Sequence, residues 1–269
     1  MLRQLLQEAQ LPEIEKLLAD KTIPYDQFIE KLDQYISDPK VKTMLHNGLK
    51  DGSIHDDRIT ASVTNISVRR LIPTQNEIDM SKSLKFIMNT DTDTIARCIE
   101  DNPVVIKIPI VTLNGRYIID GHHRWSEVYC ANSHAKMKCY NFTSNIKPID
   151  MLKKIQIAIA ADIGTVPTAN VQGLNLMTTP LDKIVSHIID NITDSAVALY
   201  NRYYNLNDSD LKKSVAVDVM LPNIEFMRRY NKPIPNAPSR DVMPQTDEAD
   251  NSLKLLVKGM ANINPPYHK

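Results

Sequence analysis

Five consecutive residues, Asp120, Gly121, His122, His123 and Arg124, combine side chains that could do chemistry. They follow an apolar strand-like stretch and precede a segment with helical character. A glycine after a strand lets the backbone approach a ligand closely, and the N-terminal amides of a following helix favour anions. Arg124 can bind a phosphate with two parallel N–H groups, and the two histidines add donors that are neutral or cationic near pH 7. The pattern indicates a phosphate site.

Asp120 is the acidic member of this group. An acid beside a phosphate site usually holds a metal ion or takes a proton from a nucleophile. Two other interpretations stay open from the residues alone. The turn could be a tight Asp-Gly turn with nothing bound. It could also be an Asp/His/His metal site, although neighbours on a strand point to opposite faces and rarely reach one metal together.

The elements that must position this group are predicted from the flanking pattern. Residues 104–113 and 116–119 read as two strands, joined by Asn114-Gly115, the strongest short hairpin signal. A helix over residues 125–132 follows, in which Trp125 is expected to anchor the core. Residues 59–73 and 136–142 read as strands, and helices are predicted after Thr74 and before Pro103.

The remainder of the chain has mainly helical periodicity. Helices are predicted within residues 1–57 and from residue 147 onward. One long amphipathic helix is expected over 179–205, and a second over 208–231 with an interruption at Pro222. The fold class is therefore α+β, with a small mixed sheet over residues 58–146 between an N-terminal region, 1–57, and a C-terminal region, 147–269. We expect the helices to pack on the central domain.

Composition limits the possible functions. The 269 residues carry 32 basic and 32 acidic side chains, and this zero net charge disfavours a protein that grips nucleic acid over its whole surface. Three cysteines, an odd number without metal-ligand spacing, are expected to be free thiols of a reducing compartment. No apolar run approaches the roughly 18 residues of a membrane span. A cytoplasmic protein without membrane contact is expected.

Residues 64–142 resemble the ParB/sulfiredoxin superfamily. The resemblance is carried by "VRRLIPTQNEID", residues 68–79, then by the hairpin and the turn "DGHHR". This turn resembles the branch that includes the free-serine kinases more than plasmid-partition ParB, which usually has "GERR" there. The turn contains no cysteine, so sulfiredoxin activity is not expected. The C-terminal half has no evident helix-turn-helix, which argues against ParB-like partition.

The resemblance implies a nucleotide-binding domain of ParB/sulfiredoxin type. It assigns Gly121, His122, His123 and Arg124 to the nucleotide phosphates, and it places Gln75 at the ligand. Asp120 would be a catalytic acid or associate with Mg²⁺ through the nucleotide. Catalytic roles are also implied for Glu77, in the region where the kinases keep an acidic residue, and for His122.

The expected function is a phosphotransferase of kinase type. It would use ATP or ADP with Mg²⁺ and act on a hydroxyl-bearing acceptor of unknown identity. A ParB-like DNA-binding nucleotide switch and a metal-dependent nuclease are the alternatives. A structural protein that kept the fold and lost the ligand is a further one.

Overall fold

The structure is a computed structural model that describes residues 60–89, 92–106, 109–143, 145, 147–149, 151–152 and 173–238. The helices predicted within residues 1–57, and those predicted for most of 147–172 and for 239–269, lie outside the described residues. The chain divides into two compact units. One comprises residues 63–140 and 172–236, and the other comprises residues 1–62, 141–171 and 237–269. The candidate site belongs to the first unit.

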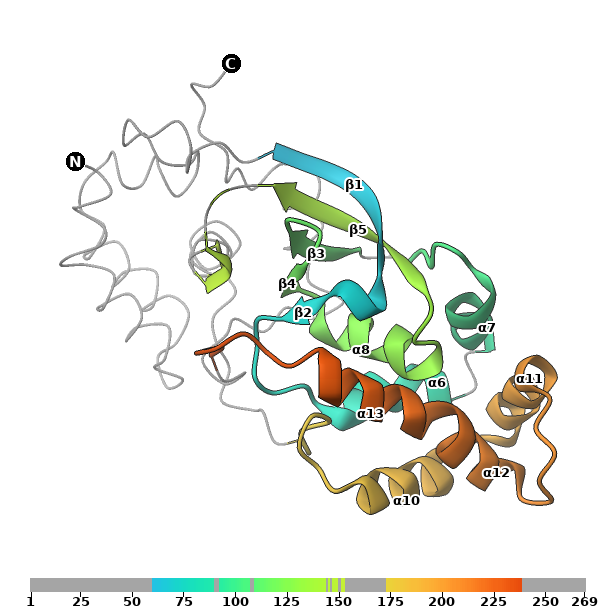
Figure 1. Cartoon of the computed structure of the whole chain (residues 1–269). Coiled ribbons are helices and arrows are strands. Elements are labelled where there is room, and N and C mark those ends of the chain that lie inside the picture. The colour runs from blue at the N-terminus through green and yellow to red at the C-terminus, as the bar shows by residue number, and fades with distance from the viewer. Residues whose placement is uncertain are drawn as a thin grey trace, which may run out of the picture. The chain divides into compact units, whose positions relative to one another are not determined.

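A five-stranded sheet forms the β layer, in the order β1-β5-β3-β4-β2 (Figure 1). The strands are β1 (Thr60–Ser67), β2 (Ile72–Pro73), β3 (Ile110–Leu113), β4 (Tyr117–Asp120) and β5 (Lys136–Thr143). Strand β4 runs parallel to β2 and antiparallel to β3, so the sheet is mixed. The predicted α+β class with a small mixed sheet is confirmed.

The hairpin that precedes the site forms at the predicted turn. Asn114 and Gly115 have φ values of 55° and 59°, which these two residue types tolerate better than others. Strand β3 is shorter than predicted. Val104 forms an isolated parallel bridge with Met137, and the strand begins only at Ile110, directly after a proline that has no N–H to donate.

In Figure 1 most helices lie below and to the right of the strands, and α8 contacts β3. The helical elements are η2 (Val68–Arg70, a 3-10 turn), α6 (Met80–Met88), α7 (Thr92–Glu100), α8 (His122–Ala131), α10 (Leu181–Asn191), α11 (Asp194–Tyr204), α12 (Leu211–Ser214), η4 (Val215–Met220, a π-helix) and α13 (Leu221–Tyr230). None of the described helices is long and apolar enough to cross a membrane.

The single long helix predicted over 179–205 is wrong. The chain forms α10 and α11, which are separated at Ile192 and Thr193. The Thr193 side chain accepts a hydrogen bond from the Ala196 amide at 3.3 Å. A threonine that caps a helix satisfies one of the first-turn amides, which stabilises a new start over continuation.

The interruption predicted at Pro222 is also wrong. Helix α12 continues through η4 into α13, and the amide of Leu221 donates to the carbonyl of Ala216, five residues earlier. Pro222 lies in the first turn of α13. The wide π turn before it changes the hydrogen-bond register, so the chain stays helical past a residue without an N–H donor.

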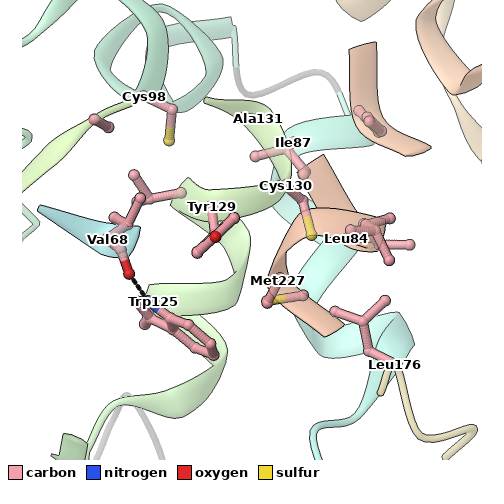
Figure 2. Close-up of a cluster of buried hydrophobic side chains, with 14 of the residues drawn as sticks. Val68, Leu84, Ile87, Cys98, Trp125, Tyr129, Cys130, Ala131, Leu176 and Met227 are labelled. Carbon is pink, nitrogen blue, oxygen red and sulfur yellow. Dashed lines mark hydrogen bonds between the residues drawn. The ribbon is translucent and has the colours of Figure 1, made fainter. Parts of the chain in front are cut away.

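One hydrophobic core joins the sheet to the helices that lie between its strands in the sequence and to the helices that follow its last strand. Trp125 is fully buried, and its indole N–H donates to the Val68 carbonyl at 2.9 Å (Figure 2). Its ring contacts the Tyr129 ring edge-on, with the two ring centroids 5.5 Å apart. Met227 of α13 and Leu176 belong to the same core. Trp125 is thus the predicted core anchor, and residues 173–236 pack on the sheet domain as expected.

The three cysteines, Cys98, Cys130 and Cys139, are free, as the sequence predicted, and all three are buried. Burial raises the pKa of the Cys139 thiol to about 12. The pKa of the Cys130 thiol is raised further, first by burial and then by the charge of Glu127. Thiols of this kind stay protonated at neutral pH and are poor nucleophiles.

Candidate functional site

The DGHHR turn lies where β4 ends and α8 begins. Asp120 is the last residue of the strand, Gly121 is the N-cap, and the helix starts at His122. This is three residues before the predicted start at Trp125. The difference matters because His122, His123 and Arg124 now form the first helical turn, whose amides have no acceptor within the helix. Such amides point along the axis and carry the positive end of the helix dipole.

Gly121 is required at this junction. Its φ is +91°, a conformation that side chains rarely adopt. A Cβ there would lie 2.6 Å from Cγ2 of Ile110 and 2.8 Å from Nη2 of Arg124. Only glycine lets the strand, the helix and the arginine approach this closely.

Arg124 folds back over Gly121 onto Asp120. Its Nη2 lies 2.6 Å from Oδ2 of Asp120, with 15% of the arginine side chain and 22% of the aspartate side chain exposed. Its Nε is buried and has no hydrogen-bond partner among the described residues. The guanidinium is therefore fixed on one side by a carboxylate, while another of its donors has no acceptor within the described part of the chain.

His122 lies buried, with 4% of its surface exposed. Its Nε2 accepts a hydrogen bond from the Thr74 amide at 3.1 Å. Burial, and then the charge of Arg124, lower the pKa of this histidine to about 3. The ring is therefore neutral at pH 7 and carries its proton on Nδ1. The imidazole thus supports the backbone at Thr74, and its roles in catalysis and phosphate binding stay predictions.

His123 makes an equivalent contact one residue later. Its Nε2 accepts from the Asp79 amide at 3.2 Å. The two histidines thus bind the two ends of the segment 74–79. This segment leaves β2 beside β4, since Pro73 pairs with Ile118 and the Thr74 hydroxyl donates to the Ile118 carbonyl at 2.5 Å.

Gln75 and Glu77 belong to this segment. Gln75 is 5% exposed, and its side-chain amide donates to the Glu77 carbonyl, so its hydrogen bonding is local. Glu77 is half-buried. The structure thus joins the two predicted parts of the site, because the histidines of the DGHHR turn hold the segment that carries Gln75 and Glu77.

Sequence reasoning missed Asn175. Its Oδ1 accepts from the Ile78 amide at 3.2 Å and its Nδ2 donates to the Asn76 carbonyl at 3.2 Å. Asn175 lies 97 residues from Ile78, and nothing in the surrounding sequence distinguishes it from other asparagines. The contact follows from tertiary packing alone.

No group of three or more histidine, cysteine, aspartate or glutamate side chains that could hold a metal ion occurs within residues 60–152 or 173–238, so far as these are described. Asp120, predicted to associate with Mg²⁺ through a nucleotide, has Arg124 as its ion-pair partner.

Comparison of the chain with protein-family models, with curated proteins and with solved structures gives no match.

Proposed function

We propose that this protein binds ATP or ADP with Mg²⁺ where β4 meets α8, and that it transfers a phosphoryl group to a hydroxyl-bearing acceptor. The observation that carries the proposal is the junction itself. A left-handed glycine opens a helix whose first turn holds an arginine with a buried donor that lacks an acceptor. The resemblance of residues 64–142 to the ParB/sulfiredoxin superfamily, in the branch of the free-serine kinases, supports a nucleotide as the anion.

The residues present fit a phosphate group in three ways. The first-turn amides of α8 are oriented donors at the positive end of the helix. Gly121 has no Cβ that would crowd the approach. Arg124 is held by Asp120 at 2.6 Å and can still donate from other N–H groups. Hydrogen bonds of this charged kind contribute about 1.5–3 kcal/mol each.

The bound nucleotide would supply the phosphoryl group, and its phosphates would supply most ligands of Mg²⁺. Glu77 is our candidate general base. Its carboxylate would take the proton of the acceptor hydroxyl while the hydroxyl oxygen bonds to phosphorus and the bond to the nucleotide's bridging oxygen breaks. Arg124 and the amides of α8 would stabilise the charge on the transferred group. Asp120 would orient Arg124, and His122 and His123 would hold the segment that carries Glu77.

The test is the melting temperature of the purified protein with Mg²⁺ and, separately, ATP, ADP, CTP or GTP. A ligand at 100 times its dissociation constant adds about 2.7 kcal/mol, which raises the melting temperature by several degrees. We expect this shift with ATP or ADP in the wild type and its loss in Arg124→Ala. The matched control is Arg97→Ala, because Arg97 is also an arginine of a helix but its side chain donates to Asp93 and Thr94 of its own turn.

The other outcomes separate the alternatives. A shift with CTP alone would favour a ParB-like nucleotide switch. Metal-dependent cutting of plasmid DNA that disappears in Asp120→Ala would favour a nuclease. No shift with any nucleotide would contradict the proposal and leave a scaffold that does not bind nucleotides.

A further inference from the structure

We propose that residues 173–179 form a positioning hook, with Asn175 as its central residue, that holds the Glu77 segment against the first turn of α8. The hook comes from the C-terminal part of the chain. Its catalytic meaning rests on the proposed function, whereas its mechanical role rests on the contacts alone. Through this hook the C-terminal part of the chain would support the site, although the predicted site residues all lie earlier in the sequence.

Asn175 binds the backbone of the segment on both sides of Glu77. Its Nδ2 donates to the carbonyl of Asn76, and its Oδ1 accepts from the amide of Ile78. The same Oδ1 accepts from the Met177 amide at 3.0 Å, which fixes the side chain within the hook. An asparagine side chain that spans one residue in this way limits where the intervening Glu77 can lie, because its neighbours on both sides are fixed.

The backbones of hook and segment also pair directly. The Met80 amide donates to the Leu174 carbonyl at 2.8 Å, and the Leu176 amide donates to the Ile78 carbonyl at 2.6 Å. Gly173 permits this approach, since a Cβ at that position would overlap the Asp79 carboxylate. The segment is therefore held on one side by the hook and on the other by the two histidines of α8.

Arg228 fixes the hook to α13. Its guanidinium donates to the carbonyl of Leu176, with Nε at 2.7 Å, and to the carbonyl of Thr179 at 2.7 Å. Burial lowers the pKa of Arg228, but an arginine remains charged at neutral pH. Charged donors bind carbonyl oxygens more strongly than neutral donors do. A rigid support of this kind is what a catalytic carboxylate needs, because small misplacements of reacting groups cost large factors in rate.

The test compares Asn175→Ala with Asn132→Ala. Asn132 is also an asparagine that bonds to backbone, through Cys98, Ile99 and the His134 amide, but it caps the opposite end of α8. A helix of 10 residues places that end about 15 Å from the first turn. Both variants lose side-chain hydrogen bonds, and only one of them touches the segment.

Two readouts are measured on the full chain. Amide hydrogen exchange is followed at residues 76–80. The kcat for hydrolysis of MgATP and of MgADP, in which water replaces the acceptor hydroxyl and inorganic phosphate is released, is measured with the dissociation constant of each nucleotide. In Asn175→Ala we expect faster exchange at residues 76–80 and a kcat about 10- to 100-fold lower, with an unchanged dissociation constant. Asn132→Ala should change neither. Asn175→Asp keeps the acceptor for Ile78 and should restore slow exchange at that amide.

The outcomes separate this inference from the proposed function. Unchanged exchange in Asn175→Ala would overturn the hook, whatever the activity. Faster exchange with the same kcat as Asn132→Ala would overturn its catalytic role. If Asn175→Ala exchanges faster but the wild type neither binds nor turns over a nucleotide, the mechanical role of the hook is supported and the proposed function is refuted.

Discussion

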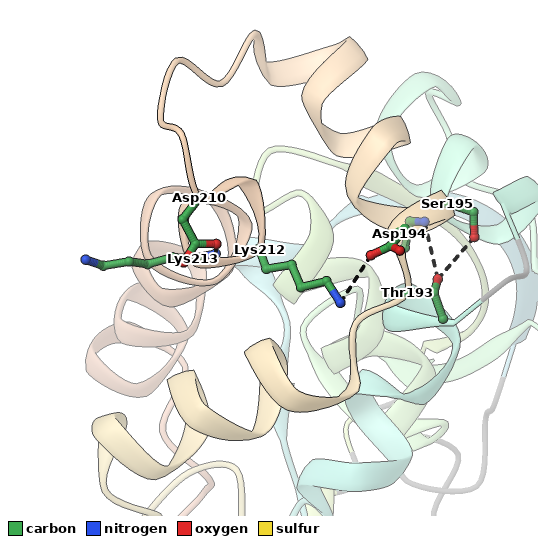
Figure 3. Close-up of polar contacts among 7 residues, drawn as sticks. Thr193, Asp194, Ser195, Asp210, Lys212 and Lys213 are labelled. Carbon is green, nitrogen blue, oxygen red and sulfur yellow. Dashed lines mark hydrogen bonds and ion pairs between the residues drawn. The ribbon is translucent and has the colours of Figure 1, made fainter.

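Two ion pairs in this molecule place the same attraction in different surroundings. Arg124 and Asp120 lie 2.6 Å apart with 15% and 22% of their side chains exposed, whereas Lys212 and Asp194 lie 3.1 Å apart with 41% and 92% exposed. Figure 3 shows the second pair, in which Lys212 of α12 reaches the start of α11. An exposed pair contributes about 0–1 kcal/mol, because water screens it and two long side chains must be ordered.

The difference shows which of the two regions holds its cation in a fixed position. Lys212 can leave Asp194 at little cost, so its position is loosely defined. Arg124 is confined by Gly121 and Asp120, and removing its partner would leave a largely buried charge. A binding site needs groups that are already in place before the ligand arrives. Three predictions test this contrast.

The largest effect is expected from Asp120→Ala. The change leaves Arg124 without its carboxylate while its Nε already lacks a partner, so we expect the free energy of unfolding to fall by about 3 kcal/mol. The matched control, Asp194→Ala, removes the exposed pair and should cost less than about 1 kcal/mol. Urea denaturation measures both. Equal losses would show that the two pairs do not differ as described.

A smaller effect is expected from Gly121→Ala, compared with Gly115→Ala. Both positions have positive φ, which costs alanine about 1–2 kcal/mol. At Gly115 the nearest atom to an added Cβ is Cδ1 of Ile66 at 3.8 Å, an ordinary contact, whereas at Gly121 the Cβ would meet Ile110 at 2.6 Å. We therefore expect Gly121→Ala to lose about 1–3 kcal/mol more than Gly115→Ala. Thermal and urea unfolding measure the difference, and indistinguishable losses would contradict it.

The smallest effect is a change in the free energy of unfolding with each pH unit, and it comes from His122. Its pKa is about 3 in the folded protein and 6.5 when solvated. Between about pH 3 and pH 6.5 the unfolded chain binds a proton at His122 that the folded protein does not bind. The stability that depends on neutral His122 is therefore complete above about pH 6.5 and is lost as the pH falls. The slope from this group approaches about 1.4 kcal/mol per pH unit. Urea unfolding at pH 7, 6 and 5 measures it.

The control for this pH effect is a glutamine variant. His122→Gln keeps a side-chain acceptor for Thr74 but cannot titrate, so its stability should vary less with pH than that of the wild type. A pH dependence in His122→Gln that equals the wild type would assign the acid sensitivity to other groups.

Local signals predicted much of the region around the site. Asn114-Gly115 predicted the hairpin, because few other pairs tolerate two positive φ values in a row. Trp125 was predicted as a core anchor from its place after the turn. The start of α8 was predicted three residues late, because the histidines and the arginine read as a turn by residue type. Their helical conformation depends on Gly121, whose left-handed backbone starts the helix earlier.

The features that the sequence could not predict depend on contacts between distant residues. That His122 and His123 accept from the amides of Thr74 and Asp79 requires β2 to pair with β4 first. Asn175 obtains its contacts with Asn76 and Ile78 only when residues 173–179 lie beside residues 74–79. The π turn before Pro222 is likewise indicated by no local pattern in the sequence.

Asn231 shows how late in synthesis this fold can close. Its side chain donates to the carbonyls of Arg69 and Leu71, 162 and 160 residues earlier, and accepts from the hydroxyl of Tyr129, 102 residues earlier. A ribosome must therefore have made residue 231 before these buried backbone groups near the site obtain their partners. Until then the nascent chain leaves the Arg69 and Leu71 carbonyls without the Asn231 side chain as a donor.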